Sequence, residues 1–447
     1  MIKNFNELGK DPLRKKTLEI LLEGIDSVMP DKILPRLVKY SSGKLSIYEE
    51  EFDLSQGNIY IMGCGKAAGL MAYTLESIIP PEKITCGIVN SIKKFPTQKI
   101  KINEASHPIP DKKGFEGMEE ILQMSKRVSP EDTVICLLSG GGSALLPDPP
   151  ENITLSELQT MTELLIKSGA ETYETNIVRK HVSLLKGGNL ARILQPARII
   201  SLIISDDLDG REDTASRPTT YENSTFRDAI EITKKYNVFD KIPKKITNYL
   251  INGFKGKIME NPKEGDSCLD NVHNYILADN KIALESMNKK AESFGFKTYK
   301  IEKTIKGETK LSAKKIGKLL KEKYREEDSF AILCSAETIV NVKGNGAGGR
   351  VQELIAYLID EISGQENSVA AAIGSDGVDF VPGIGGAIVD DKTYSIAKEK
   401  KINLLSFLEN NNTYNLHKSL NNLILMDPTN TNVGDLFVYL QEKNHGC

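Results

Sequence analysis

The chain has 447 residues, more than one ordinary hydrophobic core accommodates, so we expect two or three domains. Hydrophobic residues at 40% and charged residues at 27% are typical of a folded globular protein rather than a disordered one. A formal charge of −3 leaves no basic surplus for nucleic-acid phosphates, and 6% aromatic residues without Trp leave few platforms for stacking bases. Composition therefore argues against a nucleic-acid-binding protein.

The cysteines, histidines and apolar stretches narrow the class further. The six cysteines are scattered without a CxxC pair, as is typical of a reducing compartment, and the five histidines show no metal-binding spacing. No apolar stretch reaches the length of a membrane span, and the first residues lack the apolar core of a signal peptide. We therefore expect a cytoplasmic protein with no membrane contact and no structural zinc site.

Short apolar runs that end in Gly, Ser or Asp recur along the chain, with helical patterns between them. Continuous apolar runs of this length are typical of strands buried on both faces of a parallel sheet. The alternation of strands and helices predicts an α/β fold, in which ligands bind beyond the carboxyl ends of the strands. The runs span residues 58–66, 133–143, 199–207, 330–337 and 369–377, and the helical patterns include 155–169, 282–294 and 311–324.

The first run ends in GCGKAA, residues 63–68, ahead of a predicted helix. Backbone N–H groups at a helix start, together with Lys66, favour a bound anion. Tyr60 and Ala67 exclude a P-loop, which needs Gly and a hydroxyl residue at those positions. The alternative interpretation is a tight strand-to-helix turn with Lys66 in solvent.

The second run ends in Ser139-Gly140-Gly141-Gly142-Ser143. Three adjacent glycines let the backbone approach a ligand closely, which suits phosphate or carboxylate binding. Ala144 and Leu145 follow Ser143, so the GxSxG motif of a serine hydrolase is missing. A flexible turn is the alternative.

Residues 176–188 are dense in cations. Helical spacing lets Val178, Val182 and Leu185 face a core, while Arg179, Lys180 and Lys186 point elsewhere. A solvated helix face explains this segment as well as an anion site does, and His181 is more readily a hydrogen-bonded structural residue than a base.

Carboxylates follow two of the predicted strands. Carboxylates at strand ends beside cationic loops can hold Mg²⁺ or accept a substrate proton, although aspartates in exposed turns are also common. These residues are Asp206, Asp207 and Asp209 after one strand, and Asp376 and Asp379 after another.

Residues 252–274 are rich in Gly, Pro, Asn and charge and lack periodicity, which is typical of an interdomain connection. We therefore predict a domain over 1–255, and a linker with a second domain over 256–447.

Residues 344–350 contain a formal GxGxxG ahead of a predicted helix. Alone it favours dinucleotide binding, but the acidic residue expected at the end of the next strand is only loosely matched by Asp376. Arg350 at the helix start fits a phosphate or carboxylate clamp equally well.

Together these segments resemble the glycerate 2-kinase family, the MOFRL-domain glycerate kinases, older members of which were labelled hydroxypyruvate reductases. The resemblance covers nearly the whole chain, and its motifs occur in the family's order. They are GCGKAAGLMA (63–72), ASHPIPD (105–111), LLSGGGSALL (137–146), NIVRKHVSLLKGGNLAR (176–192), ISDDLDG (204–210), ETIVNVKGNGAGGRVQEL (337–354), GSDGVDF (374–380), GAIVD (386–390) and DPTNTNVGDL (427–436).

The resemblance implies two α/β domains: a larger Rossmann-like N-terminal domain and a smaller C-terminal domain with a mixed sheet, with the active site in the cleft between them. It also implies ATP- and Mg²⁺-dependent phosphorylation of D-glycerate, usually to 2-phosphoglycerate. By motif, the catalytic residues would be Lys66, Arg350 and Asp206. The substrate- or phosphate-binding residues would be Gly65, Ser139, Gly140, Gly141, Gly142, Ser143, Lys186, Glu337 and Asp376, with Asp206 and Asp376 as metal ligands.

The chain departs from the family pattern at several positions. Arg217 stands where the motif SGPT has its glycine, Phe380 replaces the second glycine of GTDGxDG, and Ser335-Ala336 replaces a glycine pair before Glu337. These changes leave substrate preference and nucleotide geometry open. The residues alone do not decide whether the 2- or the 3-hydroxyl is phosphorylated, and the resemblance favours the 2-position.

We expect Lys66 and Arg350, from different domains, to bind the substrate carboxylate and the transferring phosphate, because phosphoryl transfer mainly needs positioning and neutralisation of charge. Asp206 or Asp376 would bind Mg²⁺ or orient the hydroxyl. The alternative activity is NAD(P)H-dependent reduction of hydroxypyruvate, and a non-catalytic anion-binding module is a third possibility. A homodimer is compatible with an enzyme of this size, but no segment predicts one.

Overall fold

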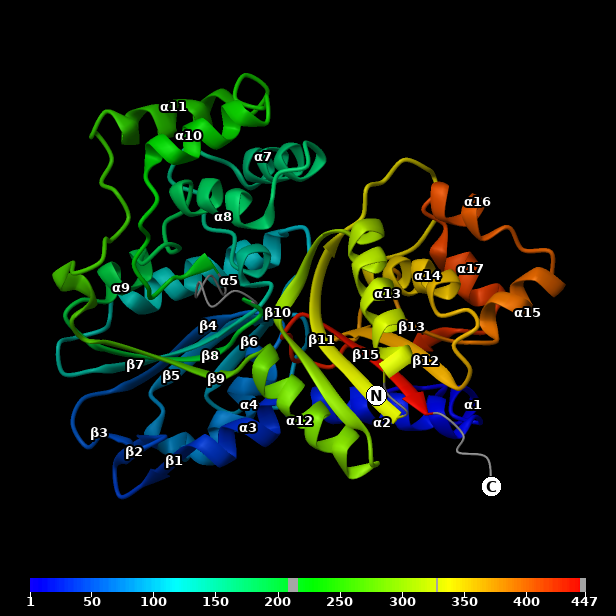
Figure 1. Cartoon of the computed structure of the whole chain (residues 1–447). Coiled ribbons are helices and arrows are strands. Elements are labelled where there is room, and N and C mark those ends of the chain that lie inside the picture. Colours follow the sequence, from blue (N-terminus) through cyan, green and yellow to red (C-terminus); the bar gives the residue numbers. More distant parts are fainter. Residues whose placement is uncertain (208–215, 327–328, 443–447) are drawn as a thin grey trace. The chain divides into compact units, whose positions relative to one another are not determined.

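The structure is a computed structural model that describes residues 1–207, 216–326 and 329–442. The chain divides into two compact units (Figure 1), one of residues 30–277 and one that combines 1–29 with 278 onward. The predicted α/β class is confirmed in both. These units differ from the predicted division at 255/256, because the strand Val272–Ala278 completes the first sheet and the helix Pro12–Asp26 packs in the second unit.

The unit of residues 30–277 is built on a six-stranded sheet with the order β6-β5-β4-β7-β8-β9. The pairs β5–β6, β4–β5, β4–β7 and β7–β8 are parallel, and every residue of β4 and β7 is buried, as their continuous apolar runs predict. This strand order is that of a doubly wound Rossmann-like fold, with its reversal between β4 and β7. The strands are β4 (Ile59–Cys64), β5 (Cys86–Ser91), β6 (Ile100–Glu104), β7 (Thr133–Ser139), β8 (Arg198–Ile204) and β9 (Val272–Ala278).

Helices cover both faces of this sheet, and a helical lobe adds a core of its own. Met118 and Ile121 of α5 pack with Tyr60 and Met62 of β4 on one face. The sheet helices are α4 (Ala68–Ile78), α5 (Lys112–Ser125), the short α6 (Gly142–Leu145) and α9 (Asn189–Leu194), and the lobe consists of α7 (Leu155–Lys167), α8 (Thr172–His181), α10 (Phe226–Lys235) and α11 (Lys244–Phe254). The smaller elements are α3 (Pro30–Leu37), β1 (Val38–Ser41), β2 (Lys44–Ile47), β3 (Glu50–Asp53) and the 3₁₀ turns Pro81–Lys83 and Ser267–Leu269.

The other unit has a mixed six-stranded sheet with the order β10-β11-β15-β12-β13-β14. Strands β10 and β11 are parallel, and the other neighbouring pairs are antiparallel. The mixed sheet agrees with the expectation from the family resemblance. The strands are β10 (Lys297–Glu308), β11 (Ser329–Ile339), β12 (Ser368–Gly374), β13 (Ile384–Asp390), β14 (Leu423–Leu425) and β15 (Asp435–Glu442).

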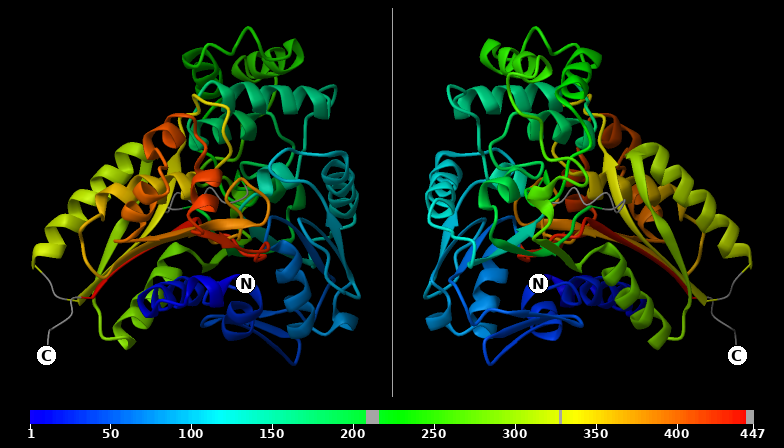
Figure 2. Two further views of the ribbon diagram at one scale, coloured as in Figure 1. Left: turned by 90° about the vertical axis from the view of Figure 1, so that its right-hand side faces the viewer. Right: turned by 90° about the vertical axis from the view of Figure 1, so that its left-hand side faces the viewer.

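Two helix pairs sandwich the mixed sheet, with α13 and α14 on one face and α2 and α12 on the other (Figures 1 and 2). The start of α2 is encoded locally, since Asp11 Oδ1 accepts hydrogen bonds from Leu13 N at 2.9 Å and Arg14 N at 3.1 Å, and Pro12 occupies the first turn. The helices are α1 (Phe5–Leu8), α2 (Pro12–Asp26), α12 (Asn280–Ser293), α13 (Thr309–Glu326), α14 (Arg350–Glu361), α15 (Thr393–Glu399), α16 (Leu404–Glu409) and α17 (Thr413–Ser419). Within the described ranges, no helix combines the length and apolarity that crossing a bilayer requires.

Candidate active site

The loops after β4 and β7 lie together at the carboxyl ends of the two strands where the sheet order reverses. Lys66 N donates to Gly140 O at 2.9 Å, and Ala67 N donates to Ser139 Oγ at 2.9 Å. In doubly wound sheets, ligands bind in the crevice at this reversal. The structure therefore brings together the predicted Lys66 and Ser139–Ser143 segments at the position where a ligand is expected.

Close packing explains two of the glycines in these loops. Gly65 has φ +135°, and a Cβ there would collide with the Ser139 hydroxyl. Gly141 has φ +83°, and a Cβ there would lie 3.0 Å from His107 Cδ2 and 3.1 Å from Lys66 Cγ. The stem of Lys66 thus runs alongside the glycine loop, and a larger residue at either position would separate the two segments.

The next strand end adjoins the same loop. Ser143 Oγ is within hydrogen-bonding distance of Ser216 Oγ, which lies in the segment after β8. Asp206 and Asp207 come after Ser205, the first residue beyond β8, and both are half-buried. Asp207 N donates to Ser205 Oγ at 3.1 Å. The third aspartate of this predicted group, Asp209, lies outside the described residues.

Lys186 has an internal partner. Its side chain is buried, and its ammonium group pairs with Asp148 and donates to Leu146 O at 2.7 Å. Asp148 also accepts from Ser183 Oγ and from Leu185 N. This pair joins the segment that follows the Ser139–Ser143 loop to the turn before α9, so Lys186 supports the loop from inside the fold.

The expectation that Lys180 and Lys186 point away from the core is wrong, because Lys186 is buried beside Asp148 and Lys180 is buried as well. The Lys180 side chain is 1% exposed and pairs with Glu222. Burial alone would raise the pKa of Glu222, but the Lys180 charge and hydrogen bond lower it to about 2. His181 is buried beside this pair, and its Nδ1 lies 2.8 Å from Ile177 O, which fits the structural role considered for it. The helical spacing predicted that a charged side chain would face solvent. Here the partner carboxylate of Glu222 lies inside the lobe, so the Lys180 charge is neutralised without contact with water.

In the other unit, Arg350 is the first residue of α14 and forms a two-pronged ion pair with Asp435 at the start of β15. The distances are 2.6 Å from Nε to Oδ2 and 2.9 Å from Nη2 to Oδ1. Asp435 is 6% exposed while Arg350 remains 44% exposed, and the Asp435 carboxylate raises the pKa of Arg350 above its usual value. The guanidinium is thus a permanently charged group with a fixed orientation and an accessible surface.

Strand register gathers the other predicted residues of this unit near Arg350. Asp435 lies opposite Ala336 of β11 and opposite Gly374 of β12. Glu337 follows Ala336 and pairs with Lys306 at 3.3 Å, and Asp376 follows Gly374 after two residues. The carboxyl ends of β11 and β12 therefore bring Glu337, Arg350 and Asp376 to one edge of the sheet.

Asp379 caps the helix that carries Arg350. It accepts hydrogen bonds from Val351 N at 3.1 Å, Gln352 N at 2.8 Å and Gln352 Nε2 at 3.0 Å. Burial raises the pKa of Asp379 to about 6. Asp379 was predicted as one carboxylate of a strand-end pair, and its observed contacts are with the start of α14.

The glycine loop of residues 344–349 is held by a turn of three asparagines, Asn410–Asn412. Asn411 Oδ1 accepts from Lys343 N and Gly344 N at 2.7 and 3.0 Å, and Asn410 O accepts from Gly346 N at 2.9 Å. A Cβ at Gly344 or Gly346 would collide with this turn. Close packing inside the unit thus accounts for these glycines without a bound dinucleotide.

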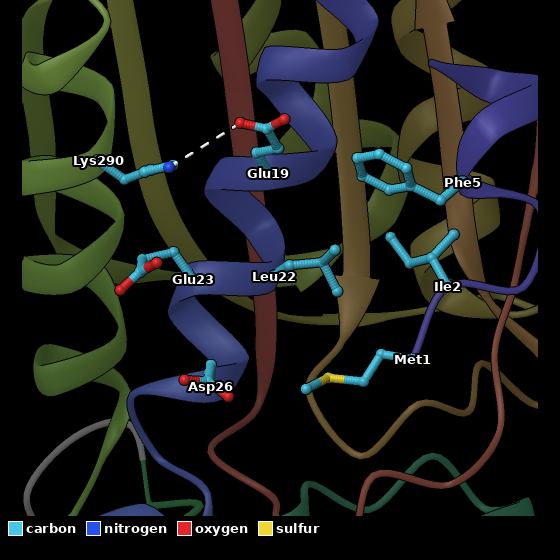
Figure 3. Close-up of a pocket in the computed structure, with 8 residues that line it drawn as sticks. All are labelled: Met1, Ile2, Phe5, Glu19, Leu22, Glu23, Asp26 and Lys290. Carbon is cyan, nitrogen blue, oxygen red and sulfur yellow. Dashed lines mark ion pairs between the residues drawn. The ribbon is translucent and has the colours of Figure 1, made fainter.

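A pocket of about 450 Å³ in the same unit contains none of the predicted residues (Figure 3). It is lined by Met1, Ile2, Phe5, Glu19, Leu22, Glu23, Asp26 and Lys290. Three of its side chains are acidic, and Lys290 lies 3.9 Å from Glu19. Neither its charge nor its position connects it with the loops described above.

Asp148 and Asp435 are the positioning residues that the sequence did not single out. Asp435 lies in the segment 427–436, which resembles a family motif, and this resemblance was the sequence feature that could have indicated it. Nothing in the sequence indicated that Asp435 pairs with Arg350.

Comparisons with known proteins agree over nearly the whole chain. Residues 16–251 match the family model described as a domain of unknown function, DUF4147, and residues 330–435 match the MOFRL family. Glycerate 2-kinase of Pyrococcus horikoshii is 35% identical, with 97% of this chain and 98% of that protein covered, and D-glycerate 2-kinase of Thermotoga maritima is 32% identical, with 96% and 99% covered. A crystal structure of glycerate kinase from Thermotoga maritima aligns with a TM-score of 0.78 at 30% identity, covering 95% of this chain and 98% of that one. Because this identity extends over nearly the whole of both chains, this chain belongs to the glycerate 2-kinase family.

Proposed function

We propose that this protein catalyses ATP-dependent phosphorylation of D-glycerate and forms 2-phosphoglycerate. The observation that carries the proposal is the packing of Lys66 against the glycine loop at the point where the strand order reverses. Backbone N–H groups and a lysine suit a phosphate chain, and relatives of similar length are named glycerate 2-kinases.

In this proposal Lys66 and Arg350 neutralise the charges of the carboxylate and of the transferring phosphate. The two groups belong to different units, and positioning and neutralisation of charge are what phosphoryl transfer mainly needs. Asp206 orients the substrate hydroxyl or helps to hold the metal. Lys186 supports the loop rather than touching the substrate, because its ammonium group has partners inside the fold.

The carboxylates of Asp206 and Asp376 supply the oxygen ligands that Mg²⁺ prefers. Among residues 1–207, 216–326 and 329–442, no group of three His, Cys, Asp or Glu side chains could hold a metal ion. Mg²⁺ commonly takes one or two carboxylates together with substrate phosphates, so these residues fit an ion that enters with the nucleotide. Such an ion would neutralise negative charge on the phosphates.

The test is incubation with ATP, Mg²⁺ and D-glycerate, followed by phosphorus NMR. We expect ADP and 2-phosphoglycerate. The 3-phosphate isomer would change the assigned hydroxyl, and the absence of ADP would contradict the kinase assignment. Hydroxypyruvate reduction is tested in parallel by the absorbance of NADH and NADPH, and we expect no oxidation, since packing accounts for the glycines of residues 344–349.

We propose a cytoplasmic location, and a homodimer is compatible with an enzyme of this size. Cys64, Cys86, Cys136, Cys268 and Cys334 are free thiols, which fits a reducing compartment. Light scattering of the purified protein tests the oligomeric state.

A further inference from the structure

A small pocket adjoins the glycine loop in the unit of residues 30–277. It has a volume of about 230 Å³, and its floor is made by Leu138 of β7, Ile203 of β8 and Ile276 of β9. Polar groups of Arg217, Thr219 and Asn274 complete the lining. An aliphatic floor with a few polar groups at one side is the usual composition of a site for a flat heterocycle.

Two connections link residues of the pocket to the candidate phosphate site. Leu138 directly precedes Ser139 at the start of the glycine loop. At the other end of the loop, Ser143 Oγ contacts Ser216 Oγ, and the next residue is Arg217. A molecule whose phosphates lie against the glycine loop would therefore have its remaining part beside this pocket.

Arg217 gives the pocket its chemical character. Its Nε is buried and has no hydrogen-bond partner within residues 1–207, 216–326 and 329–442, and its guanidinium carbon lies 5.0 Å from the centre of the Tyr221 ring. An unpaired buried donor is costly unless a ligand supplies an acceptor. Thr219 Oγ1 donates a hydrogen bond to Asn274 Oδ1 at 2.9 Å, so these two side chains are paired with each other. The buried Nε–H of Arg217 is therefore available to donate to a ligand.

We propose that this pocket binds the purine base of the nucleotide donor, with Arg217 as the residue that recognises it. The inference rests on the proposed function, because it assumes that the donor is a nucleoside triphosphate. The volume is below the range typical of sites for whole drug-sized ligands, which fits a base whose sugar and phosphates lie outside. The aliphatic floor disfavours glycerate or phosphate as the occupant, since burying a charged group against it would be unfavourable.

Calorimetric titration of the full-length protein with ADP and, separately, with tripolyphosphate tests the proposal. Arg217→Gly removes the guanidinium at a position with φ +57°, where glycine adopts the backbone without strain, so loss of folding does not confuse the result. Phe380→Gly is the matched control, because φ is +61° there as well and the side chain is 82% exposed in the other unit. Ile276→Trp, at a side chain 37% exposed, narrows the pocket by an independent route.

We expect Arg217→Gly and Ile276→Trp to raise the Kd of ADP roughly tenfold, the order of one lost stacking or hydrogen-bond contact, and to leave that of tripolyphosphate unchanged. Phe380→Gly should change neither. Unchanged ADP affinity in both pocket variants would overturn the base assignment while leaving the kinase activity intact, and parallel losses of ADP and tripolyphosphate would show that Arg217 contacts phosphate instead. The proposed function fails separately if the parent protein produces no phosphoglycerate.

Discussion

Arg350 and Asp435 form a two-pronged ion pair in which the carboxylate is buried and the guanidinium remains accessible. The pair fixes the direction of the guanidinium at the start of α14, beside the carboxyl ends of β11 and β12. A charged group that is held in place before the substrate arrives needs no reorganisation during the reaction.

Removal of either proposed cation should reduce turnover strongly. Lys66→Ala and Arg350→Ala should each lower kcat by a factor of roughly 10² to 10³, as for the loss of one donor to a transition state. Steady-state assays with ATP and D-glycerate measure this. Lys101→Ala is a suitable control, since Lys101 forms an exposed pair with Glu120 in the same unit as Lys66. Turnover within twofold of the parent would remove that cation from the catalytic set.

Asp435 should act through Arg350. Asp435→Asn keeps the shape of the side chain but loses the negative charge that holds the Arg350 guanidinium in place. We therefore expect kcat/KM to fall by roughly tenfold, which is less than for Arg350→Ala. Arg350→Lys should be intermediate, because lysine keeps the charge but lacks the planar fork. The control is Asp427→Asn, since Asp427 pairs with Lys3 in an exposed position of the same unit. An Asp435→Asn enzyme as active as the parent would contradict the positioning role.

The sequence was sufficient to predict what depends on local pattern. Buried strands leave continuous apolar runs, so β4 and β7 were predicted correctly, and the glycine-rich segments lie at their carboxyl ends as expected. Long-range pairing leaves no such pattern. Asp435 follows Arg350 by 85 residues, and nothing local indicates which aspartate the guanidinium contacts.

The domain division and the buried lysines differ from the expectations for related reasons. The helix α2 packs on strands β12 and β15, more than 300 residues later in the chain, so composition near residue 255 could not indicate its unit. Lys180 is surrounded by charges of its own segment, and only the fold brings Glu222 to it. Periodicity describes which side of a helix a residue lies on, but not whether another charged group covers that side.

Phe380 should be a source of backbone strain. Its φ is +61°, a region unfavourable for residues with a Cβ, and its side chain is 82% exposed, so little packing would be lost on substitution. Phe380→Gly should raise the free energy of unfolding by about 0.5–1 kcal/mol, after allowing for the greater freedom of glycine in the unfolded chain. Denaturant titration followed by circular dichroism measures the change. Phe380→Ala keeps the strain and should bring no gain, whereas equal stabilisation by both variants would contradict this explanation.

Asp379 should make stability depend on pH. Its pKa is about 6 in the folded protein because the carboxyl group is buried, whereas an unfolded aspartate titrates near pH 3.9. Between these values the folded protein binds more protons than the unfolded chain, so the contribution of Asp379 to stability falls as pH rises from about 4 to about 6. The full difference is about 3 kcal/mol for a two-unit shift. Glu222 has a pKa of about 2 in the folded protein, so its effect on stability has the opposite pH dependence. The stability that Glu222 contributes is lost as pH falls below about 4.5.

The comparison that isolates titration at this position is Asp379→Asn, whose single side-chain oxygen can still accept from either Val351 N or Gln352 N. Loss of the other hydrogen bond lowers the stability of the variant but adds no titrating group. Unfolding free energies of parent and variant should be measured between pH 4.5 and pH 7.5. The parent should lose stability relative to Asp379→Asn as pH rises through this range, by roughly 2 kcal/mol, and the difference should become constant above about pH 7. A constant difference between the parent and Asp379→Asn at every pH would mean that the Asp379 carboxyl group keeps one protonation state throughout, in which case the hydrogen bonds at the start of α14 outweigh its burial.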